Sequence, residues 1–173
     1  MTEQTLPGRC WWVVDGRLLA GGYPYNPGID DSESFLRQLL ASGIDAFVDL
    51  TEEDELTHYQ QLLPKLSDRE LLYRRFEIQD YSVPSIATMH AIVAHLNTLL
   101  DAGKTVYLHC RGGIGRSGTV AGCWLRSQGL TGEEALSEVA RRFAKSNAAR
   151  HTQSPETDEQ RQMVTDYEFV LRE

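Results

Sequence analysis

Short apolar runs alternate along the chain with longer stretches in which apolar residues are three and four positions apart. The short runs predict β-strands, and the longer stretches predict amphipathic helices. The predicted strands are 11–14, 18–20, 44–50, 72–78 and 106–109. The predicted helices are 31–41, 57–66 with an interruption at Pro64, 85–102, 119–128, 131–145 and 157–171. This alternation predicts an α/β fold with a central, mostly parallel sheet flanked by helices.

Local signals refine this expectation. Asp15-Gly16 between the first two strands is typical of a β-hairpin, which we expect at one edge of the sheet. Residues 131–134, Thr-Gly-Glu-Glu, match a capping box that opens a helix. Residues 146–155 are predicted to form a polar loop. The strand 106–109 is expected to be central and to carry functional residues at its carboxyl end.

Length and composition predict one domain over residues 1–173. The chain has 173 residues, of which 41% are hydrophobic, and no linker divides it. Its cysteines, Cys10, Cys110 and Cys123, are odd in number and lack a paired metal-ligand spacing, and the acidic run 52–55 lacks a calcium-loop pattern. We therefore expect a cytoplasmic protein without a disulfide framework, a metal or another cofactor.

The charge and hydropathy of the chain disfavour nucleic acid and membranes as binding partners. The formal net charge of −8 at pH 7 disfavours a broad nucleic-acid or anionic-membrane surface, because such binding needs many Lys and Arg contacts. No apolar stretch approaches the length of a membrane span, and the first residues lack a signal-peptide pattern. We expect a monomer that binds neither nucleic acid nor membrane. Arg74-Arg75 and the cluster Arg141-Arg142, Lys145 and Arg150 are either solvated faces or contacts for a second phosphate or an acidic segment.

The candidate chemistry lies in residues 109–118, His-Cys-Arg-Gly-Gly-Ile-Gly-Arg-Ser-Gly, between the last predicted strand and a helix. A loop that enters a helix N-terminus directs unpaired backbone N–H groups toward one anion, and glycines permit the backbone to converge there. Arg116 can hold two phosphoryl oxygens in a planar fork. Thiolates are favoured in such a field, so we expect Cys110 to be a nucleophile at neutral pH. The alternative, a packing turn with a buried cysteine, does not require this arginine and these glycines.

The pattern His-Cys-x5-Arg-Ser resembles the signature of the cysteine-dependent protein tyrosine phosphatase superfamily. The resemblance implies that Cys110 attacks phosphorus and that His109 assists the thiolate through hydrogen bonding rather than as a base. Ser117 would stabilise the thiolate as it leaves the intermediate. The phosphoryl group would be bound by the loop residues Arg111, Gly112, Gly113, Ile114, Gly115 and Arg116. The loop is not a nucleotide-binding P-loop, because Arg116 replaces the lysine that such loops require.

The reaction also needs a proton donor for the leaving group. Asp80, followed by Pro84, resembles the general-acid loop of the compact dual-specificity branch, and the tryptophan that precedes this aspartate in the tyrosine-specific branch is absent. An ordinary turn aspartate is the alternative interpretation. Glu77 and Asp101 are weaker candidates for the same role.

Two further segments extend the resemblance. Residues 17–24 are similar to the first strand and turn of small phosphatases, and residues 154–160 are similar to the segment that packs beside the active site. Gln160 would either position the hydrolytic water or act structurally. Cys123 is expected in the core, with a role as resolving partner of oxidised Cys110 as the alternative. Cys10 is a weaker candidate for such a role.

The sequence therefore predicts a phosphomonoester hydrolase that acts on phosphotyrosine, and on phosphoserine or phosphothreonine, through a cysteinyl-phosphate intermediate. A phosphoinositide or an RNA 5′-phosphate is the alternative substrate. A module that binds phosphorylated partners without turnover is the alternative from another class, and a sulfurtransferase or arsenate reductase fits the motif less well.

Overall fold

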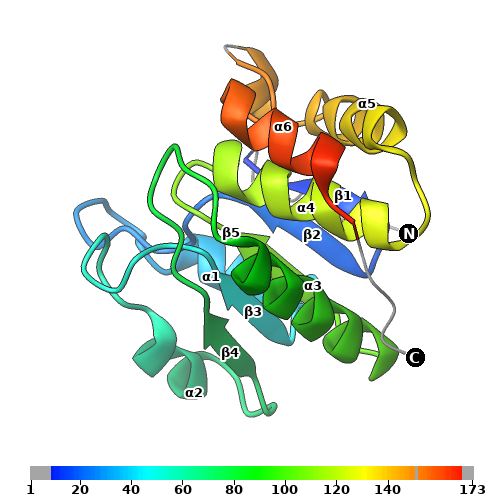
Figure 1. Ribbon diagram of the computed structural model, residues 1–173. Coiled ribbons are helices and arrows are strands. Elements are labelled where there is room, and N and C mark those ends of the chain that lie inside the picture. Colours follow the sequence, from blue (N-terminus) through cyan, green and yellow to red (C-terminus); the bar gives the residue numbers. More distant parts are fainter. Residues whose placement is uncertain (1–8, 151, 169–173) are drawn as a thin grey trace.

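The computed structural model describes residues 9–150 and 152–168, and a twisted sheet runs through its centre (Figure 1). The strands are β1 (Trp11–Val14), β2 (Leu18–Gly21), β3 (Ala46–Asp49), β4 (Leu72–Arg75) and β5 (Val106–His109). Their order is β1-β2-β5-β3-β4. The pair β1–β2 is antiparallel, and the other neighbours are parallel. The predicted α/β fold is thus confirmed, including the central position of β5 and the hairpin at the edge.

Helices cover both faces of the sheet (Figure 1). They are α1 (Ser34–Ala41), α2 (Leu63–Leu66), α3 (Ile86–Asp101), α4 (Gly115–Ser127), α5 (Gly132–Phe143) and α6 (Asp158–Asp166), with 3₁₀ turns η1 (Gln60–Leu62) and η2 (Asn147–Arg150). One apolar cluster joins the sheet to α3, α4, α5 and α6. A second cluster joins the other face to α1 and to the η1–α2 segment. Each face of the sheet is thereby removed from water, as a parallel sheet requires.

Two strands, β3 and β4, are shorter than the predicted 44–50 and 72–78. The apolar run 72–78 continues past the end of β4, where Phe76 N–H donates to Asp49 O at 2.8 Å and Ile78 N–H donates to Leu50 O at 3.1 Å. Both side chains are buried. The run therefore stays attached to β3 without regular strand geometry, and burial rather than a ladder explains its apolar residues.

Three helix boundaries differ from the prediction. Pro64 lies in the first turn of α2 and opens this helix instead of interrupting a longer one, because proline is tolerated where no backbone donor is needed. Helix α1 begins at Ser34, after Asp31 adopts a positive φ of 58°. Helix α4 begins at Gly115, inside the signature, rather than at 119.

The last helix is also shorter than the predicted 157–171. Helix α6 ends at Asp166, since Tyr167 has an extended backbone, and positions 169–171 lie outside the described residues. Thr157 and Gln160 form a reciprocal capping box at its start. At α5, where the sequence predicted such a box, Thr131 accepts a hydrogen bond from Glu134 N–H at 3.2 Å and so caps the helix.

The signature loop lies directly against the turn that follows β2. Tyr23 N–H donates to Arg111 O at 2.9 Å, and Gly113 has a φ of +77°. A Cβ on Gly113 would lie 2.5 Å from Gly21 C and 2.6 Å from Gly22 N. Glycine is required there for both the conformation and the approach of the two backbones.

We therefore expect Gly113→Ala to lower the free energy of unfolding by about 2–4 kcal/mol, the sum of left-handed strain and overpacking. Gly129→Ala is the matched control, because Gly129 has a φ of +103° and no atom within 4 Å of a built Cβ. It should cost only about 1–2 kcal/mol. Urea unfolding of both variants measures the difference, and equal losses would contradict the role of close approach.

Candidate active site

Cys110 directly follows β5, and the next residues turn into α4 at Gly115. Because β5 lies between β2 and β3, the segments that follow these two strands flank the signature loop at the carboxyl edge of the sheet. Ligands of open α/β sheets bind at this edge. The N-terminus of α4 adds partial positive charge and free backbone donors. The predicted strand, loop and helix start are therefore present.

The sulfur of Cys110 is buried, with 3% of the residue exposed. The hydroxyl of Ser117 donates a hydrogen bond to Cys110 Sγ at 3.2 Å, and the same oxygen lies 3.4 Å from Gly21 O. A donor at this distance stabilises negative charge on sulfur. The arrangement is therefore able to hold a thiolate.

Arg116 is the largest fully buried side chain in the described part of the chain, with 1% exposed. Its Nη1 and Nη2 donate to the two carboxylate oxygens of Glu55, each at 2.8 Å. Nη1 also donates to Ile78 O at 2.9 Å. The Nε atom is buried without a hydrogen-bond partner among the described residues. The guanidinium thus binds Glu55 through Nη1 and Nη2, while its Nε–H group is left without a partner among the described residues.

Glu55 is a residue that the sequence interpretation missed. It belongs to the acidic run after β3, which was considered only as a calcium loop. Burial alone would raise the pKa of Glu55, but the hydrogen bonds and charge of Arg116 outweigh it, so the pKa lies below the usual value. The position of this run at the carboxyl end of a predicted strand was the signal available in the sequence.

Asp80 lies beside the same arginine. Its Oδ1 is 3.2 Å from Arg116 Nη2, and its side chain is 40% exposed. Tyr81 N–H donates to Asp80 Oδ1 at 3.0 Å. Asp101, a rival candidate, is the last residue of α3, whereas the loop of Asp80 precedes the first residue of this helix. With a rise of about 1.5 Å per residue, the two ends of α3 are about 24 Å apart. Glu77 is exposed. Of the three candidates, the described contacts bring Asp80 to Arg116.

His109 is fully buried. Its Nε2 lies 2.6 Å from Tyr59 Oη, and its Nδ1 lies 3.2 Å from Cys110 O and 4.0 Å from Asp49 Oδ1. Burial lowers the pKa of His109, although the charge of Asp49 opposes this. The contact to Cys110 is thus made to the main chain, and His109 fixes the backbone from which the thiol projects.

Asp49 is the buried acceptor beside this histidine. It accepts hydrogen bonds from Thr51 N–H and Oγ1 at 2.9 and 2.6 Å, from Tyr73 Oη at 2.6 Å and from Arg75 Nη2 at 3.2 Å. Burial would raise the pKa of Asp49, but the charge of His109 and these hydrogen bonds keep it below the usual value. Arg75 therefore serves this network.

Arg74, Arg141 and Arg142 of the basic clusters also have internal partners. The guanidinium of Arg74 lies 4.4 Å above the ring of Phe76. Arg142 pairs with Asp15 at 2.6 Å and with Glu138 at 3.0 Å, and Arg141 pairs with Glu138 at 2.6 Å. The side chain of Arg150 lies outside the described residues. These pairs favour the interpretation of solvated, internally paired faces.

Gln160 is fully buried at the start of α6. Its Oε1 accepts from the backbone N–H groups of Glu156 and Thr157 at 3.0 and 3.1 Å, and its Nε2 donates to Ser82 O at 3.3 Å. These bonds favour the structural alternative, in which Gln160 joins α6 to the loop of Asp80. The side chains of Gln160 and Glu156 both lie against the signature, since a Cβ on Gly115 would be 2.9 Å from the amide nitrogen and oxygen of Gln160 and 3.1 Å from Glu156 Oε2.

The remaining cysteines are buried free thiols. Burial raises the pKa of Cys123 and of Cys10 to about 12 in each case. Cys123 lies on the buried face of α4 and belongs to the core, as expected, and Cys10 Sγ lies 3.8 Å from Tyr107 Oη. Inert thiols of this kind favour the packing interpretation over a redox one.

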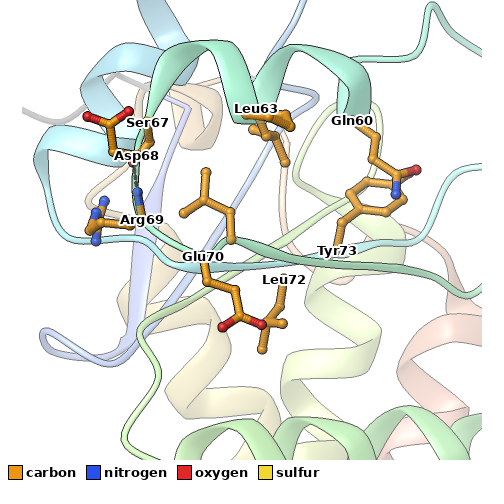
Figure 2. A pocket seen from close by; sticks show the side chains of 10 residues that line it. Gln60, Leu63, Ser67, Asp68, Arg69, Glu70, Leu72 and Tyr73 are labelled. Carbon is orange, nitrogen blue, oxygen red and sulfur yellow. Dashed lines mark hydrogen bonds between the residues drawn. The ribbon is translucent and has the colours of Figure 1, made fainter.

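The described residues contain no group of three His, Cys, Asp or Glu side chains arranged to hold a metal, and none of their helices has the length and apolarity to cross a bilayer. A separate surface cavity of about 700 Å³ lies between α2 and β4 (Figure 2). Its lining mixes Leu63 and Leu72 with Arg69 and Glu70 and includes none of the signature residues.

A buried Cys–Arg loop at the carboxyl edge of such a sheet defines the compact cysteine-based phosphatase class, as the resemblance predicted. The structure of Tk-PTP in its active form superposes with a TM-score of 0.73 and 30% sequence identity, over 92% of this chain and 95% of the other. Residues 25–130 match the family model described as "Polymorphic toxin system, DSP-PTPase phosphatase". The chain belongs to this family of dual-specificity-type phosphatases.

Two relatives have similar sequences over part of the chain. Protein 067L of Invertebrate iridescent virus 3, which is named as a tyrosine phosphatase, is 36% identical over 66% of this chain and 44% of its own length. The phosphatidylglycerophosphate phosphatase PTPMT2 of Arabidopsis thaliana is 33% identical over 66% of this chain and 47% of its own length. The chain thus spans less than half the length of these relatives.

The Glu55–Arg116 pair predicts a pH dependence of stability. A carboxyl whose folded pKa lies below its ordinary value of 4.5 stabilises the fold above that pH and loses this contribution as the pH falls through the folded pKa. Glu55→Gln should therefore be less stable than the wild type at pH 7, by about 1–3 kcal/mol for a lost charged hydrogen bond.

Urea unfolding of both proteins between pH 7 and pH 3 measures this gap, which should narrow below about pH 4.5 because a protonated Glu55 resembles glutamine. Glu53→Gln, an exposed neighbour in the same run, is the control and should leave the curve unchanged. A gap that stays constant down to pH 3 would show that the ion pair contributes nothing.

Proposed function

We propose that this protein hydrolyses phosphomonoesters through a cysteinyl-phosphate intermediate and acts on phosphotyrosine, and on phosphoserine or phosphothreonine, in proteins. The observation that carries the proposal is the buried Arg116, whose Nε edge has no partner among the described residues, beside Cys110 and Asp80. A buried unpaired donor costs about 1–3 kcal/mol, and a phosphoryl oxygen bound to it would remove that cost.

In the proposed substrate complex, the phosphoryl dianion lies over the signature loop. Its oxygens accept hydrogen bonds from the loop amides of residues 111–116 and from the Nε edge of Arg116. Glu55 holds the guanidinium in one orientation, so the fork is in position before the substrate arrives. Preorganised donors of this kind supply most of the stabilisation in phosphoryl transfer.

In the first chemical step, the thiolate of Cys110 attacks phosphorus and the bond from phosphorus to the ester oxygen breaks. The electron pair of that bond goes to the leaving oxygen, and Asp80 donates its proton to it. Asp80 is well placed for this role because its half-exposed carboxyl lies beside Arg116 at the opening of the site. The product is an alcohol or a phenol, and the phosphoryl group stays on sulfur.

In the second step, a water molecule attacks phosphorus while Asp80 takes its proton, and the phosphorus–sulfur bond breaks. Inorganic phosphate is released and Cys110 returns as a thiolate. The hydrogen bond from Ser117 to sulfur stabilises that leaving group. Neither step requires a metal or another cofactor.

The proposal also names a substrate class. The resemblance to the compact branch suggests a shallow site that admits more than one phosphorylated side chain. The phosphatidylglycerophosphate phosphatase among the relatives makes a phospholipid the second candidate. The presence of Cys110, Arg116 and Ser117 together argues against a module that only binds.

The nucleophile is tested with p-nitrophenyl phosphate at pH 5–7. Cys110→Ser should lower kcat by about 10³-fold or more, since removal of a nucleophile abolishes the covalent route. Cys123→Ser is the matched control and should retain turnover if it remains folded. Rapid quenching and peptide mapping of the wild type should place the phosphoryl group on Cys110, and a phosphoryl group on any other residue would refute the mechanism.

The general-acid role of Asp80 is tested by comparing kcat on two esters whose leaving groups differ in their need for a proton. Asp80→Asn should lower kcat for phenyl phosphate by about 10²–10⁴-fold, the usual contribution of general acid catalysis. The loss should be much smaller for p-nitrophenyl phosphate, whose leaving group needs less protonation. Glu77→Gln serves as the control. Equal losses on the two esters, or an unchanged rate on phenyl phosphate, would assign the acid to another residue.

A further inference from the structure

Three loops that meet at Arg116 carry acidic side chains and few cations. They are residues 51–58 after β3, residues 77–84 after β4, and residues 152–158 before and at the start of α6. None of these described residues is Lys or Arg. Their acidic residues are Glu52, Glu53, Asp54, Glu55, Glu77, Asp80, Glu156 and Asp158.

Contacts show that the loops converge. Glu55 and Asp80 lie 2.8 and 3.2 Å from the guanidinium of Arg116. The third loop is held to the second by the bond from Gln160 Nε2 to Ser82 O. Glu156 from this third loop lies near Gly115, the first residue of α4. Two carboxylates thus contact the guanidinium, and a third lies beside the first residue of α4.

Glu156 interacts electrostatically with Asp80 and Arg116. Burial raises the pKa of Glu156, the charge of Asp80 raises it further, and the charge of Arg116 lowers it. Glu156 has no ion pair of its own among the described residues, whereas Arg116 already has its bidentate partner in Glu55. Its carboxylate is therefore the one in the site whose charge is least compensated.

The cations of the site are few. Arg116 and Arg111 are the arginines of the signature loop, and the charge of Arg111 acts on Glu55. The phosphoryl dianion can use the loop amides and the Nε edge, but a second anionic group beside it would meet Asp80 and Glu156. A basic group at the same place would gain from these carboxylates.

Apolar side chains are exposed beside the acid. Tyr81, next to Asp80, is 62% exposed, and Ile86, at the start of α3, is 52% exposed. Tyr81 has a φ of 62°, a backbone conformation that is rare for a tyrosine. Tyr81, the neighbour of Asp80 in the chain, thus offers an exposed aromatic side chain that suits the side chains of a polypeptide.

We propose that the substrate is a polypeptide whose phosphorylated residue is flanked by basic or uncharged residues, and that Glu156 determines this preference by repelling a second anion. The proposal rests on the proposed phosphatase function and names its substrate class. A phospholipid with further phosphate groups, presented on an anionic surface, is the substrate that the acidic loops disfavour.

The test uses the full chain and three phosphotyrosine peptides of one sequence, with Arg, Gln or Glu at the positions on both sides of the phosphotyrosine. The wild type should show the highest kcat/KM on the Arg peptide and the lowest on the Glu peptide, with a ratio of about tenfold. The ratio should shrink when the ionic strength is raised to about 1 M, where the Debye length is about 3 Å.

Glu156→Gln should raise kcat/KM on the Glu peptide about fivefold relative to the Gln peptide. Glu156→Lys should reverse the order of the Arg and Glu peptides. Glu134→Gln is the control, because Glu134 is exposed on the first turn of α5, beyond the end of α4 that lies farthest from the signature. It should keep the wild-type ratio.

Other outcomes separate the two proposals. Equal kcat/KM on the three peptides, or a ratio that Glu156→Gln leaves unchanged, would overturn the role of Glu156. Faster turnover of a phosphatidylinositol monophosphate in anionic vesicles than of any peptide would overturn the polypeptide substrate, while phosphatase function would stand. Absence of turnover on the peptides, the lipid and p-nitrophenyl phosphate would contradict the phosphatase function itself.

Discussion

The bidentate pair between Glu55 and Arg116 is the interaction on which the geometry of the site depends. A buried guanidinium without a partner would cost several kcal/mol, and a flexible one would not present a fixed fork. Glu55 binds the Nη1 and Nη2 atoms, so the Nε–H group of Arg116 is left without a partner among the described residues. The same pair connects the loop after β3 with α4, and Ile78 O adds the segment after β4.

Sheet order explains why these segments meet. Parallel strands place all their carboxyl ends at one edge, and β5 has β3 as its neighbour. The residues after β3 therefore lie beside the signature although about sixty positions separate them in sequence. Behind the loop, the backbone at Gly21 and Gly22 approaches so closely that Gly113 cannot carry a side chain without strain. Tertiary packing thus shapes the phosphate loop from both sides.

This dependence on packing separates what the sequence could predict from what it could not. The signature could be read directly, because strand, loop and helix start are local and their chemistry lies within ten residues. The hairpin could be predicted from Asp15-Gly16, and the parallel direction of most strands from the alternation of strands and helices. Glu55 was missed because its role requires the adjacency of β3 and β5. The sequence left a structural and a water-positioning role open for Gln160, and the hydrogen bonds of its amide with two backbone N–H groups and with Ser82 O favour the structural one.

In the proposed substrate complex, Glu55 already compensates the charge of Arg116, so the dianion would be held chiefly by directed N–H groups rather than by excess positive charge. Hydrogen bonds from a fixed backbone act over a short range and favour one tetrahedral group at one position. Excess positive charge would instead attract any polyanion, at longer range. A site that binds through its backbone can therefore tolerate Asp80 and Glu156 at its opening, and these carboxylates then act on the groups that surround the phosphate rather than on the phosphate itself.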